Sequence, residues 1–215
     1  MNLALNKMIT QQLKTCGIHS EAVLTLLSET PREDFLPEEL RDLAFSDSRI
    51  PLDHGQSMMT PLEEATILQA LDIQKEQTVL EIGTGSGYLT ALLAKQAKQV
   101  ISIEYHADLT QSAEKKLRHH QINNVTLITG DGIHGHLDKA PYDIIVITGS
   151  IDELDKCFHP QLLQGGKLFA IIGTGPAKKA CLFTLDKADQ WSIEVLFETN
   201  IAPLVNRYKK SSFQF

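Results

Sequence analysis

The segment at residues 78–90 restricts what this chain can fold into more than any other part of it. An apolar run at 79–82, typical of a buried strand, passes through three closely spaced glycines into an apolar run at 88–94, typical of a helix. Glycine permits a tight strand-to-helix turn and lets a ligand approach the backbone closely. The first amides of a helix have no partner within it, so they face whatever binds at the turn. The segment therefore predicts a nucleotide site built around Gly83, Gly85 and Gly87.

Strands and helices alternate along the rest of the chain. Because apolar strands separated by helices form a parallel sheet covered on both faces, we expect an α/β fold. Ligands of such sheets bind at the carboxyl ends of the strands. The expected strands are 79–82, 100–104, 125–128, 142–148, 167–172, 180–186 and 191–198, with a short strand or loop at 201–205. The expected helices are 2–15, 21–27, 38–43, 62–71, 88–94, 107–119 and 151–158, with a turn at Gly165-Gly166 and an irregular, functional stretch at 46–61.

Two acidic residues narrow the choice of nucleotide. The glycine turn lacks the Gly-Lys-Ser/Thr of a phosphate loop. Glu104 ends the next strand about 20 residues further on, where a carboxylate accepts hydrogen bonds from both ribose hydroxyls. A dinucleotide uses the same position, so on the glycine turn alone an NAD-dependent oxidoreductase is the alternative. Asp131 lies between two glycines after the third strand, where it can accept from an exocyclic adenine amine. Together these features resemble the class I S-adenosylmethionine methyltransferases.

The resemblance extends beyond the cofactor site. The matching blocks are residues 32–45, 51–56, 79–91, 100–104, 130–132, 141–148, 161–168 and 202–205. They run in order over roughly residues 25–205 and together resemble the protein-L-isoaspartate O-methyltransferase family. The resemblance implies a Rossmann-like α/β fold: a mostly parallel seven-stranded sheet, helices on both faces, an N-terminal helical cap and a family-specific order of the last strands. It also implies one methyltransferase domain over 1–215, with a cap and substrate loop at 1–72, a cofactor-binding core at 73–175 and C-terminal strands at 176–215.

Carried over position by position, the resemblance assigns S-adenosyl-L-methionine, and its product S-adenosyl-L-homocysteine, to the glycine turn and the strand ends beside it. Residues 83–86 would line the methionine and ribose, Glu104 would bind the ribose, and Asp131 would flank the adenine. The implied cofactor-binding residues are Glu81, Gly83, Thr84, Gly85, Ser86, Glu104, Tyr105, Asp131, Gly132 and Thr148, with Gly149 beside the sulfonium. The implied substrate-binding residues are His54, Gln56, Ala202, Pro203 and Leu204.

The chain departs from the family at residues 55–61, Gly-Gln-Ser-Met-Met-Thr-Pro. The family usually continues Gly-Gln with Thr-Ile-Ser, and that serine lies beside the methyl-transfer point. Here Met59 occupies the position of the serine, Ser57 that of the threonine, and Thr60 follows one position later. Methionine cannot donate a strong hydrogen bond. Ser57, Met59 and Thr60 are therefore the candidate catalytic positions, with Thr60 able to compensate after a small backbone shift, while Met58 and Met59 also suit plain packing.

The resemblance implies esterification of the free carboxylate of L-isoaspartyl residues in damaged proteins, giving a methyl ester that later closes to a succinimide. A carboxylate is already an anion at pH 7, so the reaction needs no general base, only positioning and exclusion of water. Met59 keeps two alternatives open: a methyltransferase for another acceptor, and a cofactor- or peptide-binding protein with little catalysis.

Composition and charge limit the partners. The net charge of −7 does not favour nucleic acid or an anionic membrane, so we expect no stable nucleic-acid partner and no membrane association. Three scattered cysteines without CxxC spacing, and a beginning without the apolar core of a signal peptide, indicate a cytoplasmic protein with reduced thiols. The histidines lack the spacing of a metal site, so no metal is expected. We expect a monomer or weak dimer.

Overall fold

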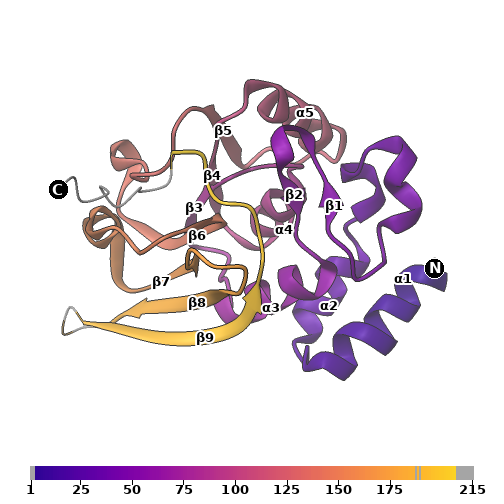
Figure 1. Ribbon diagram of the computed structural model, residues 1–215, viewed down its shortest axis with the longest axis horizontal. Coiled ribbons are helices and arrows are strands. Elements are labelled where there is room, and N and C mark those ends of the chain that lie inside the picture. The colour runs from indigo at the N-terminus through magenta and orange to yellow at the C-terminus, as the bar shows by residue number, and fades with distance from the viewer. Residues whose placement is uncertain (1–2, 187, 189, 207–215) are drawn as a thin grey trace.

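A computed structural model describes residues 3–186, 188 and 190–206, so the outermost parts of the expected cap and C-terminal segments lie outside it. Within the described residues the chain builds a seven-stranded sheet in the order β5-β4-β3-β6-β7-β8-β9 (Figure 1). The pairs from β5 to β7 are parallel, and β8 and β9 join antiparallel at one edge. The strands are β3 Thr78–Ile82, β4 Gln99–Glu104, β5 Val125–Thr129, β6 Tyr142–Ile151, β7 Leu162–Ile172, β8 Lys178–Leu185 and β9 Trp191–Thr199.

This architecture confirms the predicted fold class. The central strands carry apolar residues on both sides, as expected of strands with two covered faces. At the end of the sheet, β7, β8 and β9 are neighbours in chain order and pair antiparallel, so they form a meander. Every one of the seven expected strands is present, although β7 begins five residues earlier than its apolar run, at Leu162.

The α-helices pack on one face of the sheet, and the larger of the two hydrophobic cores lies between them and the strands. In Figure 1 the N-terminal helices α1 and α2 form the cap at the lower right, and α4 and α5 lie between this cap and the sheet strands. Buried residues of that face include Leu92 and Leu93 of α4 against Val79 and Val146 of the central strands. The helices are α1 Leu3–Lys7, α2 Glu21–Ser28, α3 Pro61–Leu71, α4 Tyr88–Gln96 and α5 Ala107–His119.

The N-terminal cap confirms several local expectations. The expected helix at 2–15 is helical from Leu3 to Cys16 as α1, the π-helix η1 (Met8–Leu13) and the 3-10 helix η2 (Lys14–Cys16). Gly17 ends it with φ +93°, a left-handed conformation that suits glycine. Ser20 caps α2 by accepting a hydrogen bond from the amide of Val23 at 3.3 Å. Two further 3-10 helices follow, η3 Arg32–Phe35 and η4 Glu38–Leu43.

The second face of the sheet is covered by 3-10 helices and loops. Two short elements, η6 Leu137–Lys139 and η7 Lys156–Gln161, lie among the segments over this smaller core. The helix expected at 151–158 is wrong, because β6 continues to Ile151 and Asp155 caps η7 instead. The turn expected at Gly165-Gly166 is also wrong, since both glycines lie within β7, where its register with β6 shifts.

The stretch at 46–61, expected to be irregular, contains a small hairpin. Strand β1 (Ile50–Pro51) pairs antiparallel with β2 (Ser57–Met58), and the 3-10 turn η5 (Asp53–Gly55) joins them. His54 in that turn has φ +58°, an uncommon conformation for a residue with a side chain. The hairpin contributes to the wall of the cavity described below.

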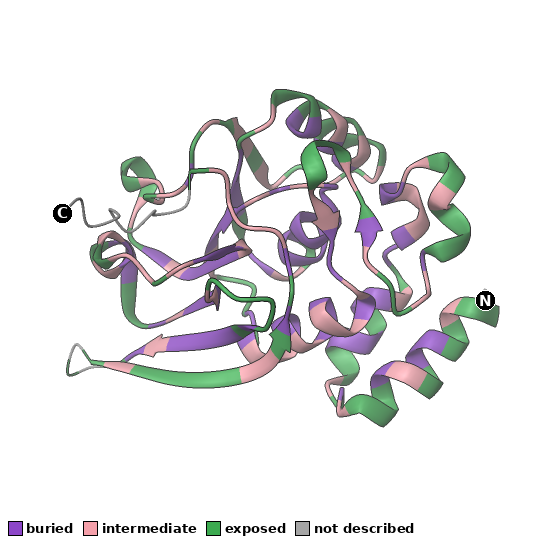
Figure 2. Ribbon diagram, viewed as in Figure 1, coloured by how far each residue is buried: buried purple, intermediate pink, exposed green. Residues whose placement is uncertain are grey.

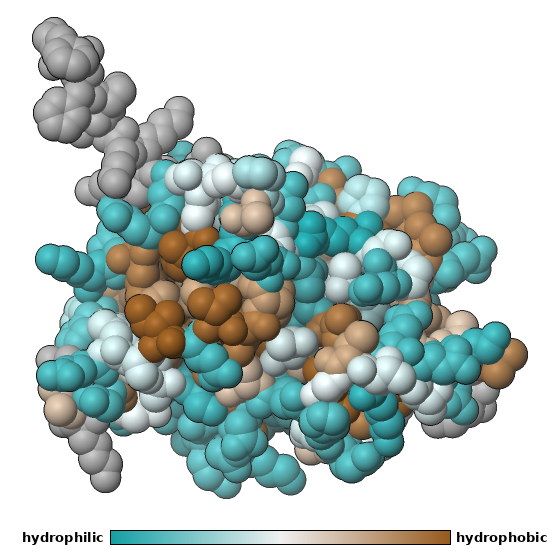
Figure 3. All heavy atoms as spheres, turned by 60° about the horizontal axis from the view of Figure 1, so that its bottom comes forward, coloured by the Kyte–Doolittle hydropathy of each residue, from teal (hydrophilic) through white to brown (hydrophobic). Residues whose placement is uncertain are grey.

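The edge strand β9 leaves apolar side chains in solvent. Ile193 is 62% exposed and Val195 50% exposed, while the central strands are buried (Figure 2). Figure 3 turns the side of the molecule that carries β9 toward the viewer and shows a larger apolar patch on the left of this face, with smaller apolar areas elsewhere among hydrophilic residues. Across the described residues, none of the helices has the length and apolar content needed to cross a membrane.

Candidate functional site

A cavity opens at the carboxyl ends of β3, β4, β5 and β6, where ligands of parallel sheets bind. Its empty volume is about 870 Å³, with the open solvent at its mouth included. One part of its wall is the glycine turn and the strand ends of the core; the other part comes from the β1–β2 hairpin and the segment after β9. Fifteen of the nineteen predicted site residues line it: Gln56, Ser57, Met59, Gly83, Thr84, Gly85, Ser86, Glu104, Tyr105, Asp131, Gly132, Thr148, Gly149, Ala202 and Leu204.

The turn after β3 is shaped so that only glycine fits at its first position. Gly83 has φ +97°, and a Cβ there would lie 2.2 Å from Oγ1 of Thr148. That hydroxyl is within hydrogen-bond distance of two carbonyls, those of Ile82 at 2.9 Å and Gly83 at 2.7 Å. The predicted residue Thr148 therefore fixes the turn from the end of β6, and the bare backbone of Gly83 leaves room for a ligand beside it.

The carboxylate of Glu104 is held in the cavity wall by main-chain amides. Oε2 accepts from the amide of Gly85 at 2.9 Å, and Oε1 accepts from the amide of His106 at 3.0 Å. Glu104 is only 5% exposed and lines the cavity. A carboxylate oxygen has more than one lone pair, so this fixed group can still accept from a pair of hydroxyls. Its position fits the ribose diol of an adenosine-containing ligand.

Glu81 does not line the cavity, in contrast to the other residues predicted near the turn. Its side chain is fully buried below the turn and accepts from Thr90 Oγ1 at 2.5 Å and Ser102 Oγ at 2.6 Å. Ser102 also contacts the hydroxyl of Thr84 at 2.6 Å, so a chain of hydrogen bonds runs from Glu81 into the glycine turn. Burial raises the pKa of Glu81 to about 7, against the effect of these hydrogen bonds.

The far end of the cavity combines one acid with apolar walls. Asp131 bonds the amide of Ile133 at 3.0 Å through Oδ1 and the side-chain amide of Asn206 at 3.0 Å through Oδ2. Ile103 and Ile133 line the same region, and a Cβ on Gly132 would lie 2.9 Å from Cγ2 of Ile82. Apolar walls with a carboxylate acceptor beside them are suited to a purine ring.

The other side of the cavity is held together by Ser150 at the end of β6. Its amide donates to the carbonyl of Ala202 at 3.0 Å, and its carbonyl accepts from the amide of Leu204 at 3.0 Å. Pro203 pairs with Ser150 as an isolated parallel bridge and does not line the cavity. The carbonyl of Ala202 and the amide of Leu204 are thus already hydrogen-bonded within the protein. Peptide binding by residues 202–204 stays a prediction, and it would have to use their other main-chain groups.

Met59 faces the cavity, and Thr60 does not. Met59 is 6% exposed, and its carbonyl accepts a hydrogen bond from Nη2 of the buried Arg32 at 2.6 Å. Thr60 caps α3: its hydroxyl accepts from the amide of Glu63 at 3.3 Å, while the Glu63 carboxylate accepts from the amide of Thr60 at 2.9 Å. A hydroxyl used in a capping box is poorly placed to replace the serine, so compensation by Thr60 finds no support in its position.

His54 also lies outside the cavity wall. Its Nε2 contacts both carboxylate oxygens of Asp108, at 3.0 and 2.9 Å, and its ring stacks on His106 at 3.8 Å between centroids. These contacts attach the turn of the hairpin to the start of α5. The ion pair with His54 lowers the pKa of Asp108 through a side-chain hydrogen bond.

Several lining residues were not predicted, among them Leu52, Glu64, Leu89, Ile103, His106 and Ile133. Glu64 is the least expected, because it lies on a buried face of α3 and pairs there with Arg32. Burial raises the pKa of Glu64 to about 8, although the adjacent guanidinium opposes this. Ile103 and Ile133 lie next to the predicted residues Glu104 and Asp131, and that position is the signal that identifies them. Leu52, in the hairpin, Leu89, in α4, and Glu64 carry no such signal.

Comparison with known proteins gives one consistent result. Residues 4–209 match the family model described as protein-L-isoaspartate(D-aspartate) O-methyltransferase. Among curated relatives, protein-L-isoaspartate O-methyltransferase 1 of Rhodopseudomonas palustris is 36% identical over 200 residues, covering 93% of this chain and 82% of the relative. The protein-L-isoaspartate O-methyltransferase of Idiomarina loihiensis is 34% identical over 199 residues, covering 93% of each chain.

Solved structures agree in fold. A protein-L-isoaspartate O-methyltransferase superposes with a TM-score of 0.80 at 26% identity, covering 94% of this chain and 66% of that one. A Plasmodium falciparum protein, described as a putative protein-L-isoaspartate O-methyltransferase in complex with S-adenosyl-L-homocysteine, superposes with a TM-score of 0.79 at 21% identity, covering 96% of this chain and all of the other. With the family model matching nearly the whole chain, this protein belongs to the protein-L-isoaspartate O-methyltransferase family.

Proposed function

We propose that this protein transfers the methyl group of S-adenosyl-L-methionine to the free carboxylate of L-isoaspartyl residues in damaged proteins. The observation that carries the proposal is the divided wall of a single cavity. A cofactor side with a fixed Glu104 carboxylate faces an acceptor side made of Gln56, Ser57 and Met59 and of Ala202 and Leu204. Family membership supports both halves of the assignment.

The residues of the cavity fit the cofactor. The bare backbone at Gly83 and the apolar walls at Ile103 and Ile133 suit its amino-acid and adenine parts, and Glu104 would hold the ribose. When bound, S-adenosyl-L-methionine supplies an electrophilic methyl group on its sulfonium sulfur. Thr148 would line the position next to that sulfur, where its hydroxyl keeps the turn in place.

The protein contributes chiefly by positioning the acceptor. An isoaspartyl carboxylate is ionised at pH 7 and attacks without a general base. Arg32 fixes the main chain at Met59, and Ser150 fixes the segment 202–204, so the two edges of the acceptor side have set positions. Holding the acceptor in line and excluding water provides the rate enhancement. The products are S-adenosyl-L-homocysteine and a methyl ester.

A labelled-methyl transfer assay tests the proposal. The substrate is an isoaspartyl peptide, and the matched control is the same peptide with a normal aspartyl residue. We expect base-labile label in the isoaspartyl peptide alone. Equal labelling of both peptides, or binding of S-adenosyl-L-homocysteine without any transfer, would contradict the proposed acceptor. We further propose a cytoplasmic monomer or weak dimer, in agreement with the charge and cysteine usage.

A further inference from the structure

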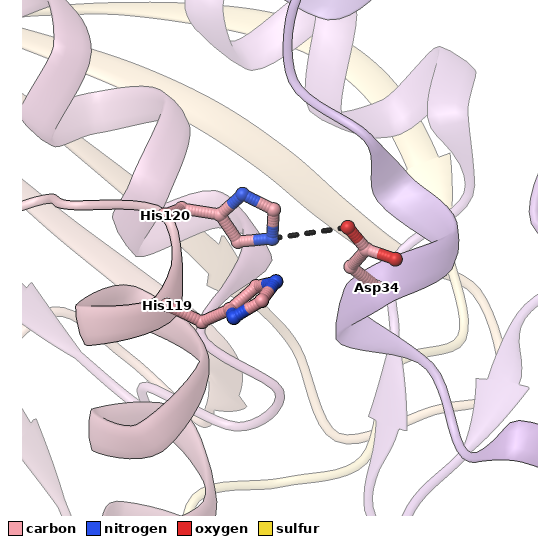
Figure 4. A group of neighbouring side chains, drawn as sticks. All are labelled: Asp34, His119 and His120. Carbon is pink, nitrogen blue, oxygen red and sulfur yellow. Dashed lines mark ion pairs between the residues drawn. The ribbon is translucent and has the colours of Figure 1, made fainter.

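Two histidines and an aspartate meet at the seam between the cap and the core, remote in sequence from the glycine turn. Asp34 belongs to η3 of the cap, while His119 and His120 end α5 of the core. Figure 4 shows Nε2 of His120 facing a carboxylate oxygen of Asp34, with the ring of His119 directly beside them. One ligand atom from each of the three residues lies within 4.8 Å of the others.

The geometry of the two rings suits convergence on one point. The imidazoles of His119 and His120 are nearly perpendicular, at 86°, with centroids 5.1 Å apart. Nε2 of His120 lies 3.2 Å from Oδ2 of Asp34, yet it is buried and makes no hydrogen bond with acceptable angles. A buried polar nitrogen without a hydrogen bond is unfavourable and gains from a ligand. The His120 ring itself is held in place by stacking on Phe35 at 5.2 Å.

We propose that Asp34, His119 and His120 form a site for Zn²⁺ that links the N-terminal cap to α5. Imidazole nitrogen and one carboxylate oxygen are ligands that zinc accepts, with water completing a tetrahedron. Calcium and magnesium require oxygen ligands, so two imidazoles exclude them. His119 is exposed, so its imidazole is accessible from solvent, and the three ligand atoms already lie within 4.8 Å of one another.

The seam also holds one cationic side chain, Lys95, near the ring of His120. Burial lowers the pKa of His120, and His119 and Lys95 act in the same direction, while Asp34 opposes them. Lys95 also repels a cation, and a single carboxylate offsets that charge, so the two nitrogen ligands must supply most of the affinity.

Two other groups of potential ligands are less suitable. The rings of His54 and His106 are parallel, at 3°, so their lone pairs point side by side instead of toward one ion. In the group of His134, Asp155 and Cys157, burial raises the pKa of the thiol to about 12, which opposes the thiolate that a metal needs. The seam site is therefore the group to test first.

The test is calorimetric titration of the full chain with ZnCl₂, repeated with Co²⁺ for its visible absorption. His119→Ala removes an exposed side chain, and Asp34→Asn replaces the aspartate with a side chain of nearly the same shape, so both variants should fold. We expect each to bind one equivalent of zinc about tenfold more weakly, or worse. His19→Ala, which removes an exposed histidine outside any such group, should match the wild type. Identical isotherms for all four proteins would overturn the proposal.

A thermal measurement gives an independent readout. At free zinc 100 times the dissociation constant, the unfolding midpoint of the wild type should rise by about 5–10 °C. His119→Ala and Asp34→Asn should lose most of that rise, while His19→Ala keeps it. A rise of equal size in every variant would place the zinc elsewhere and exclude this site. Neither measurement depends on methyl transfer, so failure here leaves the proposed enzymatic function untouched.

Discussion

Glu104 shows how one side chain can be both anchored and available. Two main-chain amides bind its oxygens, and the same oxygens face the cavity. Because the amides orient the carboxylate before any ligand arrives, less conformational freedom is lost on binding. The residue also ties the turn after β3 to the start of α5, so its loss should affect binding more than folding.

Replacing Glu104 with glutamine should weaken the binding of S-adenosyl-L-homocysteine by about 10- to 100-fold, since charge-assisted hydrogen bonds are worth roughly 1.5–3 kcal/mol. Calorimetric titration measures the change. The exposed Glu76→Gln is the matched control and should bind like the wild type. An unchanged affinity in Glu104→Gln would remove Glu104 from the cofactor site.

Met59→Ser should raise kcat/KM for an isoaspartyl peptide by about tenfold or more. The new hydroxyl would donate to the acceptor carboxylate, which the thioether cannot do. Met59→Leu changes the shape without adding a donor and should show no gain. If both variants behave alike, residue 59 affects packing only, and the acceptor carboxylate is oriented by other groups.

At the scale of elements, β3 supports the glycine turn from below through Glu81. The hydrogen bonds from Glu81 through Ser102 to Thr84 connect β3, β4 and the turn, and all three side chains are buried. Oε1 of Glu81 has no hydrogen-bond partner, which fits a carboxyl that holds a proton near neutral pH.

This carboxyl predicts a pH dependence of stability. Its pKa rises on folding from the ordinary 4.5 to about 7, so the folded protein keeps a proton that the unfolded chain releases. The stabilisation is complete below pH 4.5 and is lost as the pH approaches 7, by up to about 3 kcal/mol. Glu81→Gln should flatten this part of the profile in urea unfolding; Glu64 contributes in the same direction to both proteins, so their difference isolates Glu81. Parallel profiles would disprove the shift.

Regular strands were predictable from the sequence, and their connections were less so. Apolar runs such as 142–148 identify buried strands because both faces of the sheet are covered. Ile151, Leu154 and Phe158 have helical spacing, yet they fill the second face from a strand end, a loop and a 3-10 turn. The spacing of apolar residues alone cannot distinguish a helix from a loop that buries the same side chains, because either one can cover that face of the sheet. Glycines mark turns, but Gly166 approaches the carbonyls of Asp143 and Leu163 inside β7, where a Cβ would clash at 2.8 Å.

In the candidate site, too, some residues were predictable from local sequence motifs and others were not. Local motifs predict the cofactor side, because the glycine turn, Glu104 and Asp131 each follow a strand of the core. Glu64 and His106 join the cavity through tertiary packing, which no local pattern encodes. The capping role of Thr60 was readable from Thr60-Pro-Leu-Glu63, a capping box, and it competes with the catalytic role that the resemblance suggested.

At the scale of the whole molecule, Arg49 connects the two segments that form the acceptor side. Its guanidinium contacts Glu63 of α3 at 2.6 Å, the hydroxyl of Thr199 and the carbonyl of Asn200 at 3.0 Å. The hairpin region of the cap and the end of β9 are thus held together by one partly buried side chain. None of these contacts of Arg49 involves the glycine turn.

Arg49→Ala should therefore raise KM for the peptide and lower kcat/KM by about tenfold, because misplacement of the acceptor side reduces alignment. Affinity for S-adenosyl-L-homocysteine should stay within about twofold, and the midpoint of unfolding should fall by a few degrees, as about 1 kcal/mol is lost. Lys14→Ala breaks an exposed ion pair with Glu21 and serves as the control. A parallel loss of cofactor affinity would show that the two sides are not independent.

The acceptor wall comes from residues near 50–60 and 199–205, while the cofactor wall comes from the strand ends between them. During evolution, substitutions can therefore accumulate in one wall of the cavity independently of the other. Substitutions in the outer segments are expected to alter the acceptor while the cofactor wall keeps its shape, whereas a change at Gly83 or Glu104 is expected to weaken cofactor binding and so lower transfer to every acceptor. Descendants of such a fold are expected to diverge first in their acceptors, and a methionine in place of a serine at position 59 is the kind of difference that such divergence leaves behind.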